Sequence, residues 1–156
     1  MSSLEEKPIE QQILQFILHR DFYSGVKHIL SEDMFEGLSK TVFRTILNCH
    51  DIATTNLTAG EVHSMLLTSN PALTKSSRED LADIFNRMRD PSEEQNVDLH
   101  RKIVEDFWAR DQARIIGERA IDIYTGDSTD FAPIKSILDR VSEHSIKGSE
   151  TYTIVE

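Results

Sequence analysis

The six glycines are candidates for phosphate binding, because a glycine-rich loop can cradle phosphate groups with its backbone amides. A P-loop requires the pattern Gly-x-x-x-x-Gly-Lys-Ser/Thr. The glycines lie at positions 25, 37, 60, 117, 126 and 148, with no two five apart and none followed by Lys. The sequence therefore contains no P-loop, and we expect this chain to bind no nucleotide.

The single cysteine and the six histidines could supply zinc ligands or a nucleophile. The sequence has no His-Glu-x-x-His pair, and no second cysteine accompanies Cys49. Cys49 is followed by His50, which could activate a thiolate, but a small apolar residue that completes a buried helix face is the simpler interpretation. We expect no catalytic residue, no metal ligand and no cofactor in this chain.

Asp127 and Asp130 could mark a cation-binding loop. An EF-hand requires alternating oxygen ligands, a central glycine and a distant glutamate, and this segment lacks that pattern. We therefore interpret residues 125–130 as a turn between two helices, with Gly126 in the left-handed conformation and Asp130 as an N-cap.

The composition is typical of a globular domain, with 38% hydrophobic and 28% charged residues. No apolar run approaches the roughly 20 residues needed to cross a bilayer, and the N-terminal residues do not resemble a signal peptide. With one cysteine there is no internal disulfide, so we expect a soluble, cytoplasmic protein that does not associate with membranes. The net charge of −10 opposes counterion release from phosphates, so we expect no direct DNA binding.

Apolar residues spaced by three and four predict helices along almost the whole chain, and hence an all-α fold. Residues 9–18 are apolar on most sides, as in a helix at the centre of a bundle, and residues 21–25 should interrupt this helix. The other predicted helices span residues 26–30, 38–47, 58–70 (opened by a capping box of Thr58 and Glu61), 77–90, 96–124 and a last segment after 130.

Residues 96–124 predict one helix of about 43 Å, longer than a compact bundle of this size can cover. Its first half, with Leu99, Ile103, Val104 and Phe107 on one side, should pack on the preceding bundle. Its second half should pack on the following helix as an αα-hairpin. We therefore predict a disordered N-terminus (1–7), a small helical bundle (8–95) completed by the first half of the long helix, a projecting long-helix hairpin (96–145) and a strand-like start of a linker (146–156).

The hairpin is the predicted protein-binding element, and its helices should meet along a seam. The predicted seam residues are Ile116, Ala120, Ile123, Ile134, Ile137, Leu138 and Val141. Trp108 and Ile115 should lie on another side, where a monomer would expose them; core packing is the alternative for Trp108. The candidate interface residues are Trp108, Ile115, Ile116, Ile123, Ile137, Leu138 and Val141.

The order of the apolar segments resembles the N-terminal domain of DnaB-type replicative helicases, and most of all its diverged version in T-even-like tailed phages. The similarity covers about residues 7–142 and depends on apolar spacing rather than on an invariant motif. The segments that carry it are 9–18 (IEQQILQFIL), 33–35 (DMF), 41–46 (TVFRTI), 103–110 (IVEDFWAR), 114–116 (RII) and 120–124 (AIDIY).

This resemblance implies a non-catalytic assembly domain. In that family the domain pairs through its hairpin into a collar above the hexameric motor, and it docks the primase. The implied partners are thus a second copy of the chain, a primase and possibly a helicase loader. ATP and Mg²⁺ would belong to a motor domain beyond this sequence. Two alternatives stay open: the helicase-binding domain of a primase, and a free-standing phage replication adaptor or loader, which the acidic charge disfavours.

The absence of a phosphate-binding loop leads to a first prediction. Calorimetric titration of the chain with ATP and Mg²⁺ should give only heats of dilution, because no backbone cradle with its lysine is present. A saturable heat at millimolar ATP or below would contradict this prediction.

Overall fold

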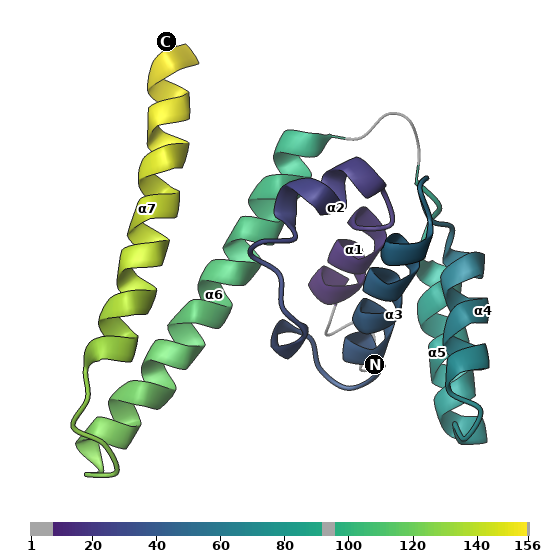
Figure 1. Ribbon diagram of the computed structural model, residues 1–156, viewed down its shortest axis with the longest axis horizontal. Helices are drawn as coiled ribbons and strands as arrows, with labels where there is room; N and C mark the ends of the chain where they lie inside the picture. Colours follow the sequence, from purple (N-terminus) through teal and green to yellow (C-terminus); the bar gives the residue numbers. More distant parts are fainter. Residues whose placement is uncertain (1–7, 92–95, 156) are drawn as a thin grey trace. The chain divides into compact units, whose positions relative to one another are not determined.

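The computed structural model describes the backbone of residues 8–91 and 96–155 and the side chains of residues 9–91 and 96–144. Over these residues the chain contains seven α-helices and one 3-10 turn and no strand, which confirms the predicted all-α fold (Figure 1). The elements are α1 (Pro8–Phe16), α2 (Arg20–Val26), η1 (Glu32–Met34), α3 (Leu38–Ile52), α4 (Ala59–Ser69), α5 (Lys75–Arg87), α6 (Val97–Tyr124) and α7 (Ala132–Val155). The predicted disordered segment 1–7 lies outside the described residues.

The chain divides into two compact units, Met1–Glu105 and Asp106–Glu156. The first contains the helices α1 to α5 and the beginning of α6, and the second contains the rest of α6 and all of α7. The long helix predicted from about residue 96 is confirmed, and Asn96 caps it by accepting a hydrogen bond from the amide of Leu99 (3.3 Å).

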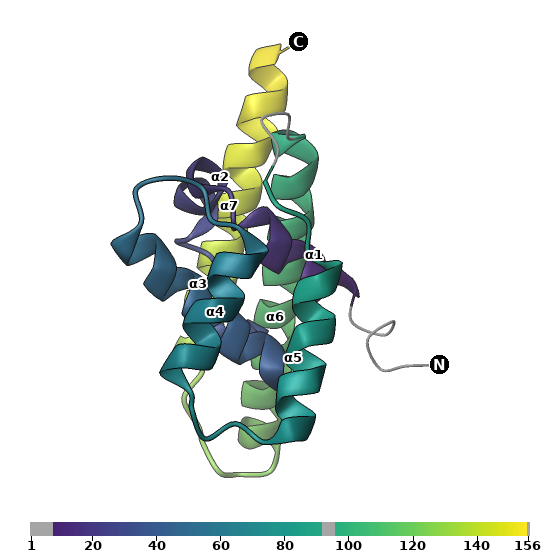
Figure 2. The same cartoon turned by 90° about the vertical axis from the view of Figure 1, so that its right-hand side faces the viewer.

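The core of the first unit forms around α1 and the turn that follows it. The fully buried side chains of this segment are Ile13, Leu14, Ile17 and Leu18. Helix α3 packs against α1, and α4 and α5 pack against each other and against α3 (Figures 1 and 2). Helix α1 is thus buried on most sides, as predicted, although Ile9 and Gln12 are exposed.

The first helix ends earlier than predicted. The break lies at residues 17–19, and the predicted interruption at 21–25 is part of α2. The reason is a local cap, since the His19 ring accepts a hydrogen bond from the amide of Phe22 (3.4 Å). Phe22 and Val26 are then buried one turn apart, and residues 27–29 form a turn instead of the predicted helix.

The other helix boundaries follow their caps. The amide of Glu61 donates to the Thr58 hydroxyl (3.1 Å) and the Glu61 carboxylate accepts from the Thr58 amide (3.0 Å), so the predicted capping box is confirmed. Helix α5 begins at Lys75, before the predicted Ser77, because the Thr74 hydroxyl accepts from the Ser77 amide (3.1 Å).

The first half of α6 is buried on a narrower face than predicted. Val104 is fully buried and Ile103 is half-buried, as expected for residues that pack on the bundle. Leu99 is 54% exposed, so its assignment to that core was wrong. His100 takes its place: its ring stacks on Phe16 with the centroids 3.8 Å apart.

The carbonyls at the end of α1 are buried, and side chains and amides from distant segments satisfy them. His50 Nε2 lies 2.6 Å from the Ile17 oxygen, so this nitrogen carries the proton and donates it to the carbonyl. The amide of Leu57 donates to the Leu18 oxygen (3.0 Å). In return, the Arg20 guanidinium donates to the oxygens of His50 (2.9 Å) and Ala53 (2.6 Å) at the end of α3, where a positive charge also favours the helix dipole.

Burial favours the neutral form of the His50 ring, although the ring can donate to the Ile17 oxygen in either protonation state. Burial lowers the pKa of His50; its hydrogen bond to Ile17 opposes this effect, and the positive charge of Arg20 adds to it. Burial also lowers the pKa of His100. At a pH below the ordinary histidine pKa of 6.5, His50 and His100 therefore bind protons more readily in the unfolded chain than in the folded chain.

A second prediction follows from these two rings. The free energy of unfolding should be highest above about pH 6.5 and should fall as the pH decreases below it, until the lowered folded-state pKa values are passed. Urea denaturation at pH 7.5 and pH 5.5 measures this loss. His100→Phe keeps the stack on Phe16 without the titrating group and should reduce the loss.

The matched control is His28→Gln, because His28 is exposed and contributes no buried ring. This variant should lose as much stability on acidification as the wild type. An acid loss that is the same in His100→Phe and in the wild type would show that protonation of His100 does not oppose folding.

Candidate interaction surface

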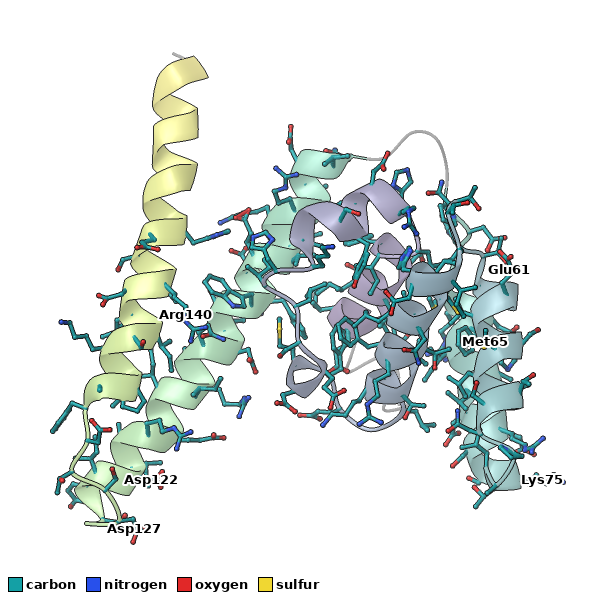
Figure 3. The ribbon with its side chains drawn as sticks, viewed as in Figure 1. Glu61, Met65, Lys75, Asp122, Asp127 and Arg140 are labelled. Carbon is teal, nitrogen blue, oxygen red and sulfur yellow. The ribbon has the colours of Figure 1, made fainter. Side chains whose placement is uncertain are left out.

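The second unit is a helical hairpin with a well-defined turn. The amide of Asp127 donates to the Asp122 oxygen (2.9 Å) and the amide of Gly126 donates to the Ile123 oxygen (3.2 Å), which is a Schellman motif that ends α6. Gly126 has φ 88°, so the predicted left-handed glycine is confirmed. Figure 3 labels Asp122 and Asp127 at this turn.

The start of α7 differs slightly from the prediction. The Asp130 carboxylate accepts from the Ala132 amide (3.0 Å), but the first intrahelical bond runs from the Lys135 amide to the Phe131 oxygen (3.1 Å). Phe131, not Asp130, is thus the residue at the N-cap. Helix α7 continues to Val155, so the strand-like conformation predicted for the tail was wrong for the backbone that is described. A strand without a neighbour leaves its amides unbonded, whereas a helix bonds them internally. That residues 146–156 start a linker stays a prediction.

The hairpin has a small interior. Among the described side chains of residues 106–144, only Trp108, Gln112 and Ile137 are buried. The Trp108 ring lies 5.2 Å from the ring of His144 in an edge-to-face arrangement, so it faces the second helix. The prediction that Trp108 lies on the side away from the hairpin seam was therefore wrong, and the core alternative holds.

The remaining predicted seam residues divide into two groups. Ile116, Ile123, Ile134 and Val141 are half-buried, as is Ile115, which the sequence assigned to the outer side. Leu138 is 51% exposed and Ala120 is exposed, so neither belongs to the seam. At about 100° per residue, Trp108, Gln112 and Ile115 share the inner side of α6, and this turns Ala113 and Ala120 outward.

Three large apolar side chains lie exposed near the turn: Ile121 (62% exposed), Tyr124 (92%) and Phe131 (64%). The sequence analysis named none of these three among the candidate interface residues. Phe131 lies between two helices, where helical periodicity gives no information about its side. Ile121 could have been found from the sequence, because it lies three residues before Tyr124 and four after Gly117, and residues at this spacing share one side of a helix.

The described residues can be searched for a metal site and for a reactive thiol. No group of three or more His, Cys, Asp or Glu side chains in them is arranged to hold a metal ion. Cys49 is 6% exposed, and burial raises the pKa of its thiol, which disfavours a thiolate nucleophile. In the same part of the chain, no helix is both long and apolar enough to span a membrane.

No protein-family model matches the sequence, and no curated protein and no solved structure matches it significantly. The exposed apolar side chains of the hairpin, Ile121, Tyr124, Phe131 and Leu138, are thus the candidate functional site on structural grounds alone.

A third prediction tests the corrected faces of α6. Trp108→Ala should destabilise the hairpin by about 3 kcal/mol, because it leaves a cavity between two helices. Tyr124→Ala, at a 92% exposed position on the same helix, should change the stability by no more than about 0.5 kcal/mol. Thermal unfolding followed by circular dichroism measures both. A larger loss for Tyr124→Ala than for Trp108→Ala would mean that the two faces are exchanged.

Proposed function

We propose that this chain is a non-catalytic assembly domain of a hexameric replicative DNA helicase, which pairs with a second copy through the α6–α7 hairpin and docks a primase. The observation that supports this proposal most directly is a two-helix hairpin with large apolar side chains on its outside. When a partner covers such a side chain, its burial contributes about 1.5–3 kcal/mol to association before ordering costs are subtracted.

The small interior of the hairpin supports a role in pairing. Two helices with three buried side chains have little to hold them together, and in proteins most of the stability of a helix comes from tertiary packing. A second hairpin would supply the missing packing. A dimer formed by a few side chains is weak, and tethering to a motor ring would strengthen it by raising the effective concentration.

The choice of a protein partner over DNA is supported by the charge. With 27 acidic and 17 basic residues, the chain offers little electrostatic attraction to phosphates. The replicative context and the primase come from the sequence resemblance alone. ATP and Mg²⁺ would act in the motor domain of the longer protein, and no residue of this chain is assigned to them or to the primase contact.

A fourth prediction tests the pairing. Sedimentation of the wild-type chain should show a concentration-dependent dimer at high micromolar concentration. Ile121→Asp should weaken it at least tenfold, because the charged side chain would be desolvated in the dimer, while the helical circular dichroism signal stays unchanged. The control is Ile52→Asp, at a 72% exposed apolar position in the first unit, which should leave association intact.

A wild type that stays monomeric would contradict the pairing. The primase part has its own measurement: titration of the chain with the helicase-binding domain of the primase from the same genome should give saturable heat. Dimerisation without primase binding would leave an assembly domain of some other complex, and the replicative proposal would then be abandoned.

A further inference from the structure

One side of α6 is exposed along the whole hairpin. At about 100° per residue, Arg110, Ala113, Gly117, Ile121 and Tyr124 lie within about 40° of a line through Gly117. All five are exposed, and they lie on the side opposite to the buried Trp108. We call these five residues the outer face of α6.

The centre of the outer face is Gly117, and no contact with the described residues requires a glycine there. Glycine in the interior of a helix costs about 0.5–1 kcal/mol relative to alanine. A Cβ added to Gly117 would meet no described atom within 4 Å, and its φ is not in the left-handed region. The described residues thus do not exclude a side chain at this position, whereas a second helix that packs closely on the outer face would.

The outer face is complementary to itself. Ala113, Gly117 and Ile121 form a row spaced by four, which is the kind of ridge by which helices commonly pack. Within this row the small Ala113 precedes Gly117 and the large Ile121 follows it, while the long side chains of Arg110 and Tyr124 lie at the two ends of the face. If two such faces cross antiparallel about a two-fold axis at Gly117, Ile121 of each copy lies over Ala113 of the other.

The same crossing places Tyr124 of each copy near Arg110 of the other. A guanidinium over an aromatic ring is attracted to it, by about 0.5–1 kcal/mol at an exposed site. A parallel crossing would instead set Tyr124 on Tyr124 and Ala113 on Ala113, which leaves a gap at the alanine end. The distribution of sizes therefore favours the antiparallel arrangement.

We propose that the outer face of α6 receives the same face of a second copy of this chain, with the two helices antiparallel and the two Gly117 residues opposite each other. This inference rests on the proposed self-association and adds the face, the direction and the point of closest approach. The part of α6 in the hairpin is about 28 Å long, so the contact belongs to the small, weak class of interfaces. Between free chains such a contact needs a high concentration, and tethering the copies together would strengthen it.

A fifth prediction tests this crossing by disulfide trapping in the full chain. Gly117→Cys, oxidised with copper phenanthroline, should form a covalent dimer at a concentration where the wild type dimerises, because opposed Cβ atoms at a close crossing come within disulfide range. Gly60→Cys is the matched control: Gly60 is also helical and exposed with open space around it, and it should stay monomeric. Cys49 is buried and should not react.

The direction is tested with two further variants. Ala113→Cys mixed with a tagged Ile121→Cys should give a mixed disulfide, whereas Tyr124→Cys should not link to itself. The reverse result would show a parallel crossing and overturn the proposal. If the wild type dimerises but Gly117→Cys forms no more covalent dimer than Gly60→Cys, the crossing at Gly117 is wrong. The proposed self-association would then still hold. A monomeric wild type would remove both.

Discussion

The buried end of α1 is the constraint on which the first unit depends. A helix that ends inside a core leaves carbonyl oxygens without intrahelical partners, and each of them must find a donor or lose the free energy of its hydration. His50 and the amide of Leu57 supply those donors for Ile17 and Leu18. His50 lies in the last turn of α3, and Leu57 follows this helix in the chain. Both donors reach their carbonyls only if α3 brings its last turn to the end of α1.

Arg20 closes this arrangement from the other side, since its guanidinium bonds the oxygens at the end of α3. Arg20, His50 and the amide of Leu57 therefore hold the ends of α1 and α3 together. His50 and Arg20 have the residue types of an active site, but here they donate hydrogen bonds to backbone carbonyls. The hairpin differs from the first unit in that few of its described side chains are buried, while Ile121, Tyr124, Phe131 and Leu138 lie exposed.

Periodicity and caps predicted most of the fold: the helices α3 and α6, the Thr58 capping box and the left-handed Gly126 depend on neighbouring residues and can be read locally. The faces of α6 could not be predicted, because this helix is apolar on two sides. Ala113 and Ala120 match the seam by spacing as well as Trp108 and Ile115 do. Side-chain size decides between them: burying a tryptophan removes far more apolar surface from water than burying an alanine, so the tryptophan side turns inward.

That choice determines what remains outside. Once Trp108 and Ile115 face inward, the helix must present Ala113, Gly117, Ile121 and Tyr124 outward, since residues about half a turn apart cannot share a side. A free-standing hairpin would gain stability by replacing the glycine with alanine and the exposed isoleucine and tyrosine with polar residues. The sequence has none of these changes, although its first unit is well capped and packed. The exposed face is thus poorly suited to a lone hairpin and well suited to one that packs against another helix.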